Sequence, residues 1–258
     1  GPFFFFFLPV YQSTSAATFI FVSTITKVPF IYPLLYLAKS YSFAPHSWAF
    51  YYTITLLVWG CVLAARDLFG ETNIRRILAY TSTINFSIAT LALVFSVFNV
   101  KIFISFIVVY LISNLAVFVW HLMLNSNKFY KLEITDLAKF NKEDKISVTM
   151  LNLATILNSG LPPATVFIFK VISLGAITYW QASNINAFSF FVAILVMLTS
   201  LVAYNAYFKI LKSVNYSETK TTPILFSGVT NKNHENYMWA FNLTCISGAL
   251  FFFTIFLL

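Results

Sequence analysis

Two lysines of this chain lie where a membrane-embedded segment rarely carries charge. Lys27 is the twelfth residue of the apolar run 16–38, and Lys170 follows the pair Pro162-Pro163 by seven residues. A lysine at the centre of a bilayer costs about 2.5–3.5 kcal/mol on insertion scales. Because desolvation disfavours a charged amine, such a group can take up and release a proton during function. Proton transfer is therefore preferred to the alternative of a snorkelling lysine, since neither residue is near a helix end.

Uncharged polar side chains in the same apolar runs could hold a chain of waters between the lysines. For any single Ser or Thr, a plain helix–helix contact is the favoured interpretation. A histidine seven residues after an asparagine shares its helix face, but it lies near the basic end of its run, so an interfacial role is favoured over a proton relay. The candidates are Thr24, Ser82, Asn85, Asn114, His121 and Asn158.

The acidic residues provide no countercharge at the level of the lysines. All eight Asp and Glu residues lie in loops or at the ends of apolar runs. Either the lysines are mostly neutral at rest, or another polypeptide supplies a carboxylate. Cys61 and Cys245 are isolated, and no CxxC or HExxH occurs, so the sequence predicts no metal site.

The composition determines the fold class. Of the 258 residues, 59% are hydrophobic and 9% charged, with a mean hydropathy of +0.81, whereas soluble domains carry about 25% charged residues. An open sheet would leave backbone groups unpaired in lipid. The sequence therefore predicts an all-α, polytopic membrane helical bundle. About seven spans are expected after a short segment, 2–12, at 16–38, 47–65, 74–97, 102–124, 146–180, 187–211 and 237–258.

Basic residues predict the orientation, because they collect on the cytoplasmic or matrix side of a membrane. The loops 66–73, 125–145 and 212–236, with the adjoining helix ends, hold twelve of the 16 Lys and Arg residues. The opposite loops, 39–46, 98–101 and 181–186, hold Lys39 and Lys101. We expect the first group to face the cytoplasm or, in a mitochondrion, the matrix. The net charge of +8 thus reports topology rather than nucleic-acid binding.

The run 146–180 is too long for one span. At 1.5 Å per residue it would form a rod of about 50 Å, against a hydrocarbon core of about 30 Å. Gly160, Pro162 and Pro163 lie near its middle, and two consecutive prolines remove two amide donors. The sequence therefore predicts a broken helix, a common way to build an ion site in a membrane.

Several motifs, in order along the chain, resemble one family of membrane proteins. Glu71-Thr-Asn-Ile-Arg-Arg-Ile-Leu-Ala-Tyr-Thr-Ser82 resembles QTNIKRLLAYSS, and Gly160-Leu-Pro-Pro-Ala-Thr-Val-Phe-Ile-Phe-Lys170 resembles GIPPxxGFxGK. Pro2 to Gln12 resembles PFHxWxPDVYxG, Tyr110 to Phe118 resembles YLLxNLGAF, and Ala203 to Lys212 resembles AYYYLRVVK. These motifs are similar to those of the antiporter-like membrane subunits of respiratory complex I, specifically the C-terminal half of the NADH dehydrogenase subunit 2 family.

The resemblance implies a role for the chain and its surroundings. It implies a proton-translocating part of NADH:ubiquinone oxidoreductase in which Lys27 and Lys170 match the two channel lysines. Flavin, iron–sulfur clusters and ubiquinone would be bound by other subunits, and this chain would bind no cofactor. Residues 1–15 would end a preceding broken helix, 16–258 would form the bundle, and a separate chain would carry the N-terminal half. The inner mitochondrial membrane is expected; the 31 Phe and 14 Tyr are typical of an A+T-rich organellar gene.

Departures from the family pattern leave two alternatives open. Phe4, Phe6 and Pro9 replace the histidine, tryptophan and aspartate of the first motif, and Asn85 stands where the family often has His or Gln. One alternative is a subunit of a multi-subunit cation/proton antiporter, which shares the fold. The other is a degenerate scaffold that only braces the membrane arm, against which the retention of both lysines argues.

Overall fold

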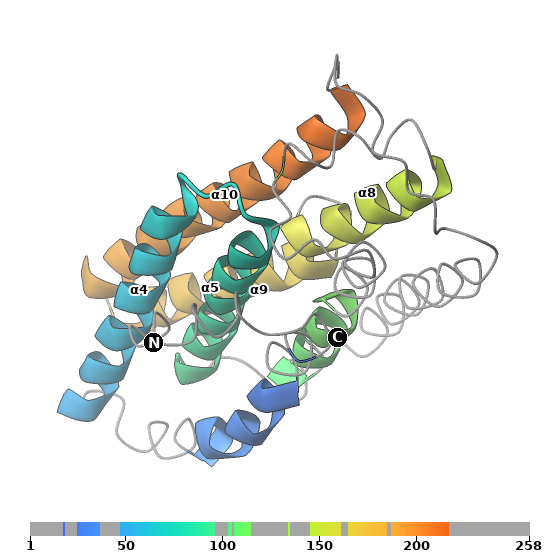
Figure 1. Ribbon diagram of the computed structural model, residues 1–258. Coiled ribbons are helices and arrows are strands. Elements are labelled where there is room, and N and C mark those ends of the chain that lie inside the picture. The colour runs from blue at the N-terminus through green and yellow to red at the C-terminus, as the bar shows by residue number, and fades with distance from the viewer. Residues whose placement is uncertain are drawn as a thin grey trace.

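A computed structural model of the chain describes helices and the turns that join some of them. The residues described are 18, 25–36, 47–95, 103–104, 106–114, 134, 145–160, 165–184 and 187–216. Three helices among them, Trp48–Leu68, Ile74–Val94 and Ala187–Asn215, are long and apolar enough to cross a membrane. The labelled elements in Figure 1 and along the chain are η2 (Ile25–Phe30), α4 (Trp48–Leu68), α5 (Ile74–Val94), α8 (Lys145–Ser159), α9 (Thr165–Asn184) and α10 (Ala187–Tyr216).

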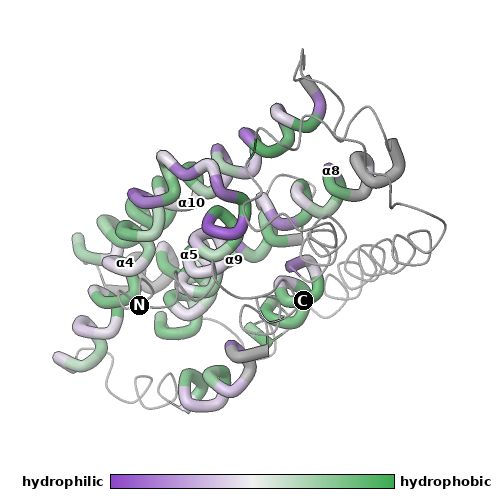
Figure 2. The backbone as a smooth tube through the Cα atoms, viewed as in Figure 1, coloured by the Kyte–Doolittle hydropathy of each residue, from purple (hydrophilic) through white to green (hydrophobic). Residues whose placement is uncertain are grey.

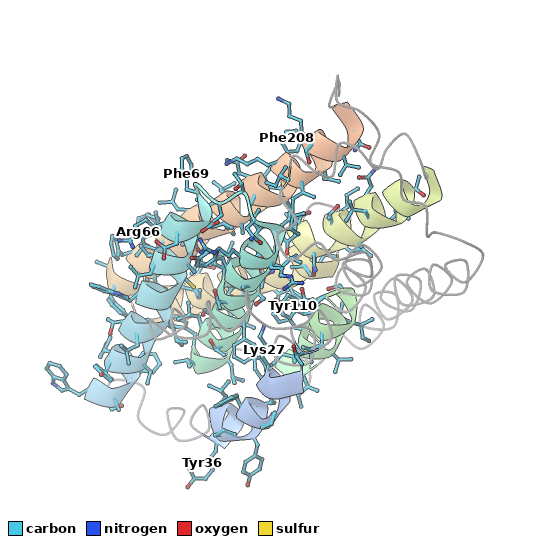
Figure 3. The ribbon with its side chains drawn as sticks, in the orientation of Figure 1. Lys27, Tyr36, Arg66, Phe69, Tyr110 and Phe208 are labelled. Atoms are coloured by element: carbon cyan, nitrogen blue, oxygen red, sulfur yellow. The ribbon has the colours of Figure 1, made fainter. Side chains whose placement is uncertain are left out.

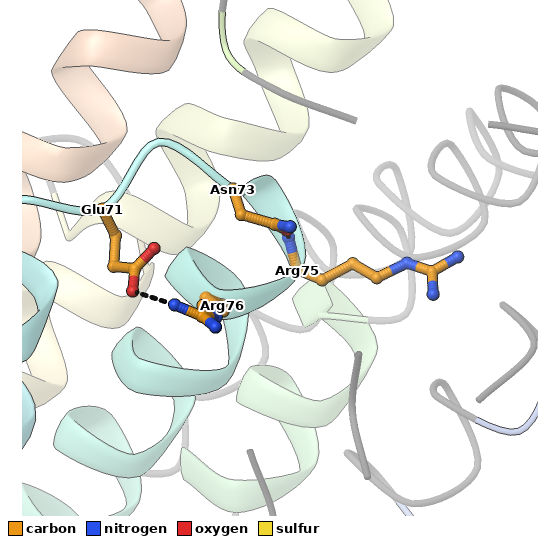
Figure 4. Close-up of polar contacts among 4 residues, drawn as sticks. All are labelled: Glu71, Asn73, Arg75 and Arg76. Carbon is orange, nitrogen blue, oxygen red and sulfur yellow. Dashed lines mark hydrogen bonds and ion pairs between the residues drawn. The ribbon is translucent and has the colours of Figure 1, made fainter. Parts of the chain in front are cut away.

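The motif around Glu71 forms the turn between α4 and α5. Asn73 is the N-cap of α5, and its side chain accepts a hydrogen bond from the backbone amide of Arg75 at 3.0 Å. Glu71 forms an ion pair with Arg76 at 2.8 Å, while Arg75 points away from that pair (Figure 4). Because the cap satisfies an amide that a helix start leaves without a partner, the most specific motif of the sequence has a structural role here.

Helix α5 is the centre of the described bundle. It packs against α4, α9 and α10, and all but three of its 21 residues are buried. In its most apolar 18-residue window 89% of the residues are buried, against 39% in α4 and 33% in α10. Helices α4 and α10 therefore form an outer layer, and large apolar side chains such as Trp59, Phe191 and Leu201 are exposed on them. Figure 2 shows that both helices are largely hydrophobic.

The long apolar run 146–180 is divided into two helices, as its length and sequence predict. Helix α8 ends at Ser159, and α9 begins at Thr165. Gly160 follows α8 with a φ of +76°, a left-handed conformation that only glycine adopts without strain. The predicted break is thus present, although Pro162 and Pro163 themselves lie outside the described residues.

Contacts between distant segments bring the ends of three basic loops together. The backbone amide of Ile134 donates to the carbonyl of Thr72 at 3.1 Å, and Lys209 Nζ donates to the carbonyl of Phe69 at 3.1 Å. The amides of Asn152 and Asn215 are hydrogen-bonded at 2.9 Å. The described parts of the loops 66–73, 125–145 and 212–236 therefore lie at one end of the bundle, where Figure 2 shows hydrophilic residues at the α4–α5 turn.

The element boundaries differ from the sequence prediction in one place that affects the site. The run 16–38 was expected to be a regular helix, but η2 is a 3₁₀ helix that contains Lys27 and Pro29. Proline has no amide hydrogen to donate, which limits the regular α-helical hydrogen bonding here. The end of the predicted span 102–124 and the whole span 237–258 lie outside the described residues.

The shared end of these loops makes the topology testable. In a background with Cys61 and Cys245 replaced by alanine, we expect Gly70→Cys and Lys212→Cys to react with an impermeant maleimide from the matrix or cytoplasmic side alone. Trp48→Cys, at the opposite end of α4, should react from the other side alone. Labelling of Gly70→Cys and Trp48→Cys from one side would show that α4 does not cross the membrane.

Candidate functional site

Lys170 rests on the C-terminal end of α8. Its Nζ donates to the carbonyl of Ser159 at 3.5 Å, and a Cβ added to Gly160 would lie 2.9 Å from that nitrogen. The last carbonyls of a helix have no partners within it and carry the negative end of the helix dipole. The broken helix therefore presents partial negative charge to a lysine side chain that is only 8% exposed.

The residue before Ser159 ties α8 to the helical segment 106–114. Ser113 Oγ donates to Asn158 Oδ1 at 2.8 Å, and Asn158 Nδ2 donates to Asn114 Oδ1 at 2.9 Å. All three side chains are buried. Because an amide in apolar surroundings is stable only when hydrogen-bonded, these bonds fix the end of α8 against 106–114.

Lys27 lies against the middle of the same segment, at Tyr110. Its Nζ is 5.6 Å from the centre of the Tyr110 ring and 5.9 Å from that of Phe86, within the range of cation–π attraction. The nitrogen is enclosed and has no hydrogen-bond partner among the described residues, although the residue as a whole is half-buried. Figure 3 shows Lys27 and Tyr110 close together beside α5.

These side chains follow one another through the bundle, and we call the row the polar seam: Lys27, Tyr110, Ser113, Asn114, Asn158 and Lys170. From Lys170 it passes over the Ser159 carbonyl to Asn158 and across to Ser113 and Asn114. Ser113 Oγ also bonds the Tyr110 carbonyl at 2.9 Å, one turn from the ring that faces Lys27. Two amines joined through hydroxyl and amide groups can exchange protons if water completes the links, and Asn114 Nδ2 is buried with no partner among the described residues.

The remaining candidates have different surroundings. Ser82 Oγ donates to the carbonyl of Ala79 at 2.8 Å, so its hydroxyl is satisfied within its own helix rather than by a contact between helices. Asn85 is buried, and both of its amide atoms lack a partner in the described part of the chain. Asn85 is therefore still a candidate for binding a water molecule. Thr24 and His121 lie outside the described residues.

Two aromatic residues of the site were not identified from the sequence. Tyr110 and Phe86 belong to apolar runs in which aromatic residues are abundant, and nothing in their spacing marks them as neighbours of Lys27. A signal did exist for Tyr110, because it lies four residues before Asn114 and shares its helix face. Phe169, next to Lys170, packs its ring 4.8 Å from that of Phe106, which holds α9 against the same segment.

Within the described residues, no group of three or more His, Cys, Asp or Glu side chains could hold a metal ion. Buried lysines, amides and a helix break inside a membrane bundle are the features from which membrane proteins build ion and proton sites. Comparison with known proteins identifies the family. Residues 2–199 match the family described as "NADH:quinone oxidoreductase/Mrp antiporter, TM", so the chain belongs to this family, and the predicted all-α membrane fold is confirmed.

Particular relatives define the position of the chain within the family. It is 26% identical to NADH-quinone oxidoreductase subunit N 2 of Hydrogenobaculum sp. over 230 residues, covering 86% of this chain and 46% of that protein. It is 30% identical to subunit N of Pelagibacter ubique over 172 residues, covering 65% of this chain and 34% of that protein. The chain thus spans about half the length, or less, of the curated relatives that it matches.

Solved structures show the same fold. Respiratory complex I from Thermus thermophilus with bound Aureothin aligns with a TM-score of 0.57 and 18% identity, covering 75% of this chain and 42% of the other. The Mrp complex from Dietzia sp. aligns with a TM-score of 0.66 and 17% identity, covering 83% of this chain and 39% of the other.

The close approach of Lys170 to Gly160 gives a prediction with a matched control. In Gly160→Ala the new methyl group would meet Lys170 Nζ at 2.9 Å, and the left-handed backbone would cost about 1–2 kcal/mol. We expect a lower midpoint of thermal unfolding and a displaced Lys170. Gly175→Ala, on α9 with nothing within 4 Å of its Cβ, should be neutral or slightly stabilising. Equal effects of the two variants would contradict the proposed contact.

Proposed function

We propose that this chain is the C-terminal half of a proton-translocating membrane subunit of NADH:quinone oxidoreductase, of the mitochondrial subunit 2 type. Lys27 and Lys170 carry the proton, and the chain holds no redox centre. The observation that carries the proposal is the polar seam, which runs between two lysines whose ammonium groups are both removed from solvent. A structural brace has no need of either charge.

The seam supports a serial path for protons. Lys27 receives or releases a proton beside the rings of Tyr110 and Phe86. Water held by Asn114 and the hydrogen-bonded Ser113–Asn158 pair links this point to the break after α8. Lys170 takes the next position, where its Nζ donates to the carbonyl of Ser159 at the end of α8. Movement of one proton along the seam thus changes the charge at both of its ends.

One alternative remains as a second candidate function. The Dietzia Mrp complex aligns with the higher of the two TM-scores, which favours a subunit of a multi-subunit cation/proton antiporter. The curated relatives are instead named subunits of NADH-quinone oxidoreductase. Purification of the chain from native membranes separates the two, because flavin and iron–sulfur proteins should accompany it in complex I and be absent from an antiporter.

The proposal includes partners and a location. In this proposal a separate polypeptide carries the N-terminal half of the subunit and packs beside Lys27, with other membrane subunits around both in the inner mitochondrial membrane. Support comes from the enclosed Nζ of Lys27, which has no hydrogen-bond partner among the described residues. All eight Asp and Glu residues of this chain lie outside its apolar runs, so a carboxylate that pairs with Lys27 belongs to another polypeptide.

Substitution of the lysines tests the function. We expect Lys27→Met and Lys170→Met to assemble but to lose most proton translocation, because one missing link interrupts a serial path. Lys27→Arg should be nearly as damaging, since arginine stays protonated at any accessible pH. NADH–quinone turnover and proton uptake would be measured in vesicles.

The exposed Lys212 on α10 provides the control. Lys212→Met removes the same charge at the surface and should translocate protons normally. A structural role for Lys27 predicts the opposite order, with Arg tolerated and Met poor. Normal proton translocation in both Lys27→Met and Lys170→Met would show that neither lysine carries protons and would favour the snorkelling interpretation.

The proposed partner is tested separately. Cross-linking from position 27, with a photoreactive residue in place of the lysine, should capture an upstream helix of the subunit that carries a mid-membrane Glu or Asp. The mass of the adduct tells whether that helix belongs to a separate polypeptide. Cross-links to lipid alone would contradict a carboxylate neighbour at this position.

A further inference from the structure

The outer faces of α4 and α10 enclose a groove that the proton path does not use. Two adjoining hollows, of about 470 and 420 Å³, lie where these two helices meet, and both are lined by Val62, Arg66 and Leu195. The groove runs from Thr55 on α4 to its C-cap Phe69. The fourteen helical rises between these two residues span about 21 Å, more than the depth of one bilayer leaflet, about 15 Å.

The wall of the groove is apolar where it enters the membrane. Trp59 and Phe191 are 62% and 60% exposed beside it. The hydroxyl of Thr55 donates to the carbonyl of Tyr52, and that of Thr199 to the carbonyl of Val196. Both threonines therefore satisfy their hydroxyl donors within their own helices, and neither needs a polar ligand in the groove.

Positive charge is confined to one end of the groove. Arg66 lines both hollows, and its side chain is 72% exposed. Its Nε and one Nη bond Asp67 Oδ1 at 3.0 Å, which leaves other guanidinium donors for a ligand. Lys209 adds a second cation at this end, with Nζ 5.5 Å from the centre of the Phe69 ring. Figure 3 shows Arg66 and Phe69 near the same end of α4.

We propose that this groove binds an anionic phospholipid from the basic-side leaflet. Its phosphate contacts Arg66 with Lys209 alongside, and one acyl chain extends between α4 and α10 toward Trp59 and Phe191. An apolar track with cations at one end is complementary to an amphiphile with a negative head. A zwitterionic lipid would gain less from the two cations, and a free phosphate would leave the apolar track empty.

The test uses two photoreactive lipids with the same diazirine-bearing acyl chain, a phosphatidylglycerol and a phosphatidylcholine. The complete complex would be reconstituted with each lipid, irradiated, and its adducts mapped to peptides. We expect adducts on the groove-lining parts of α4 and α10, with phosphatidylglycerol favoured about fivefold. That ratio corresponds to about 1 kcal/mol for one basic side chain at the headgroups.

Substitutions separate headgroup recognition from simple exposure to lipid. Arg66→Gln should bring the two lipids to nearly equal yield, whereas Arg66→Lys should keep the preference. Lys212→Gln removes a basic residue that does not line either hollow and should change nothing. Val62→Trp, which fills the shared part of the groove, should remove adducts of both lipids there.

Two results would overturn the proposal, and neither bears on the proton path. Equal yields of the two lipids in the unchanged complex would show that the groove does not recognise an anionic head. Absence of lipid adducts on α4 and α10 in the assembled complex would show that a protein segment covers this face instead.

Discussion

The interruption between Ser159 and Thr165 is the constraint on which the site depends. Hydrocarbon offers no partner to a backbone carbonyl, so a helix that stops inside a membrane must direct its last carbonyls at protein or water. Here α8 ends beneath Lys170, whose amine meets the carbonyl of Ser159. The same early stop places Asn158 at the level of Ser113 and Asn114. The seam of polar groups is thus a consequence of ending a helix in apolar surroundings.

Hydroxyl and amide side chains behave differently in this bundle. Three hydroxyl side chains of α5 each donate to a carbonyl three or four residues earlier: Thr81, Ser82 and Thr90. They can therefore be buried without a hydrogen-bond partner on another helix. An asparagine has two donors and an acceptor that its own helix cannot all satisfy. Asn158 therefore joins two helices, and Asn85 stays without a partner among the described residues. Polar contacts between the described helices accordingly rely largely on amides, with the bond from Tyr207 to Thr81 as an exception.

Hydropathy and charge predicted where the helices lie along the chain, but they did not predict which side chains of different helices contact each other. The span expected at 47–65 is observed at Trp48–Leu68, and 187–211 at Ala187–Tyr216. Both helices continue past the apolar run because Arg66, Lys209 and Asn215 have partners at the basic end. The break at Gly160 could be predicted from the sequence because its cause is local. The aromatic rings around Lys27 could not be predicted, because Phe86 and Tyr110 belong to other helical segments and reach Lys27 only through packing.

The position of the Lys27 amine argues on physical grounds against a lysine that is merely tolerated. A snorkelling lysine buries its aliphatic stem and extends the ammonium toward water. In Lys27 the reverse holds, because the residue is half-buried while Nζ is enclosed between aromatic rings. The 3₁₀ geometry of η2, with Pro29 two residues later, accompanies this inward orientation. A chain that only needed to tolerate a mid-membrane lysine would place its charge where water or headgroups could reach it, so the inward amine is the feature that supports the proposed role in proton transfer.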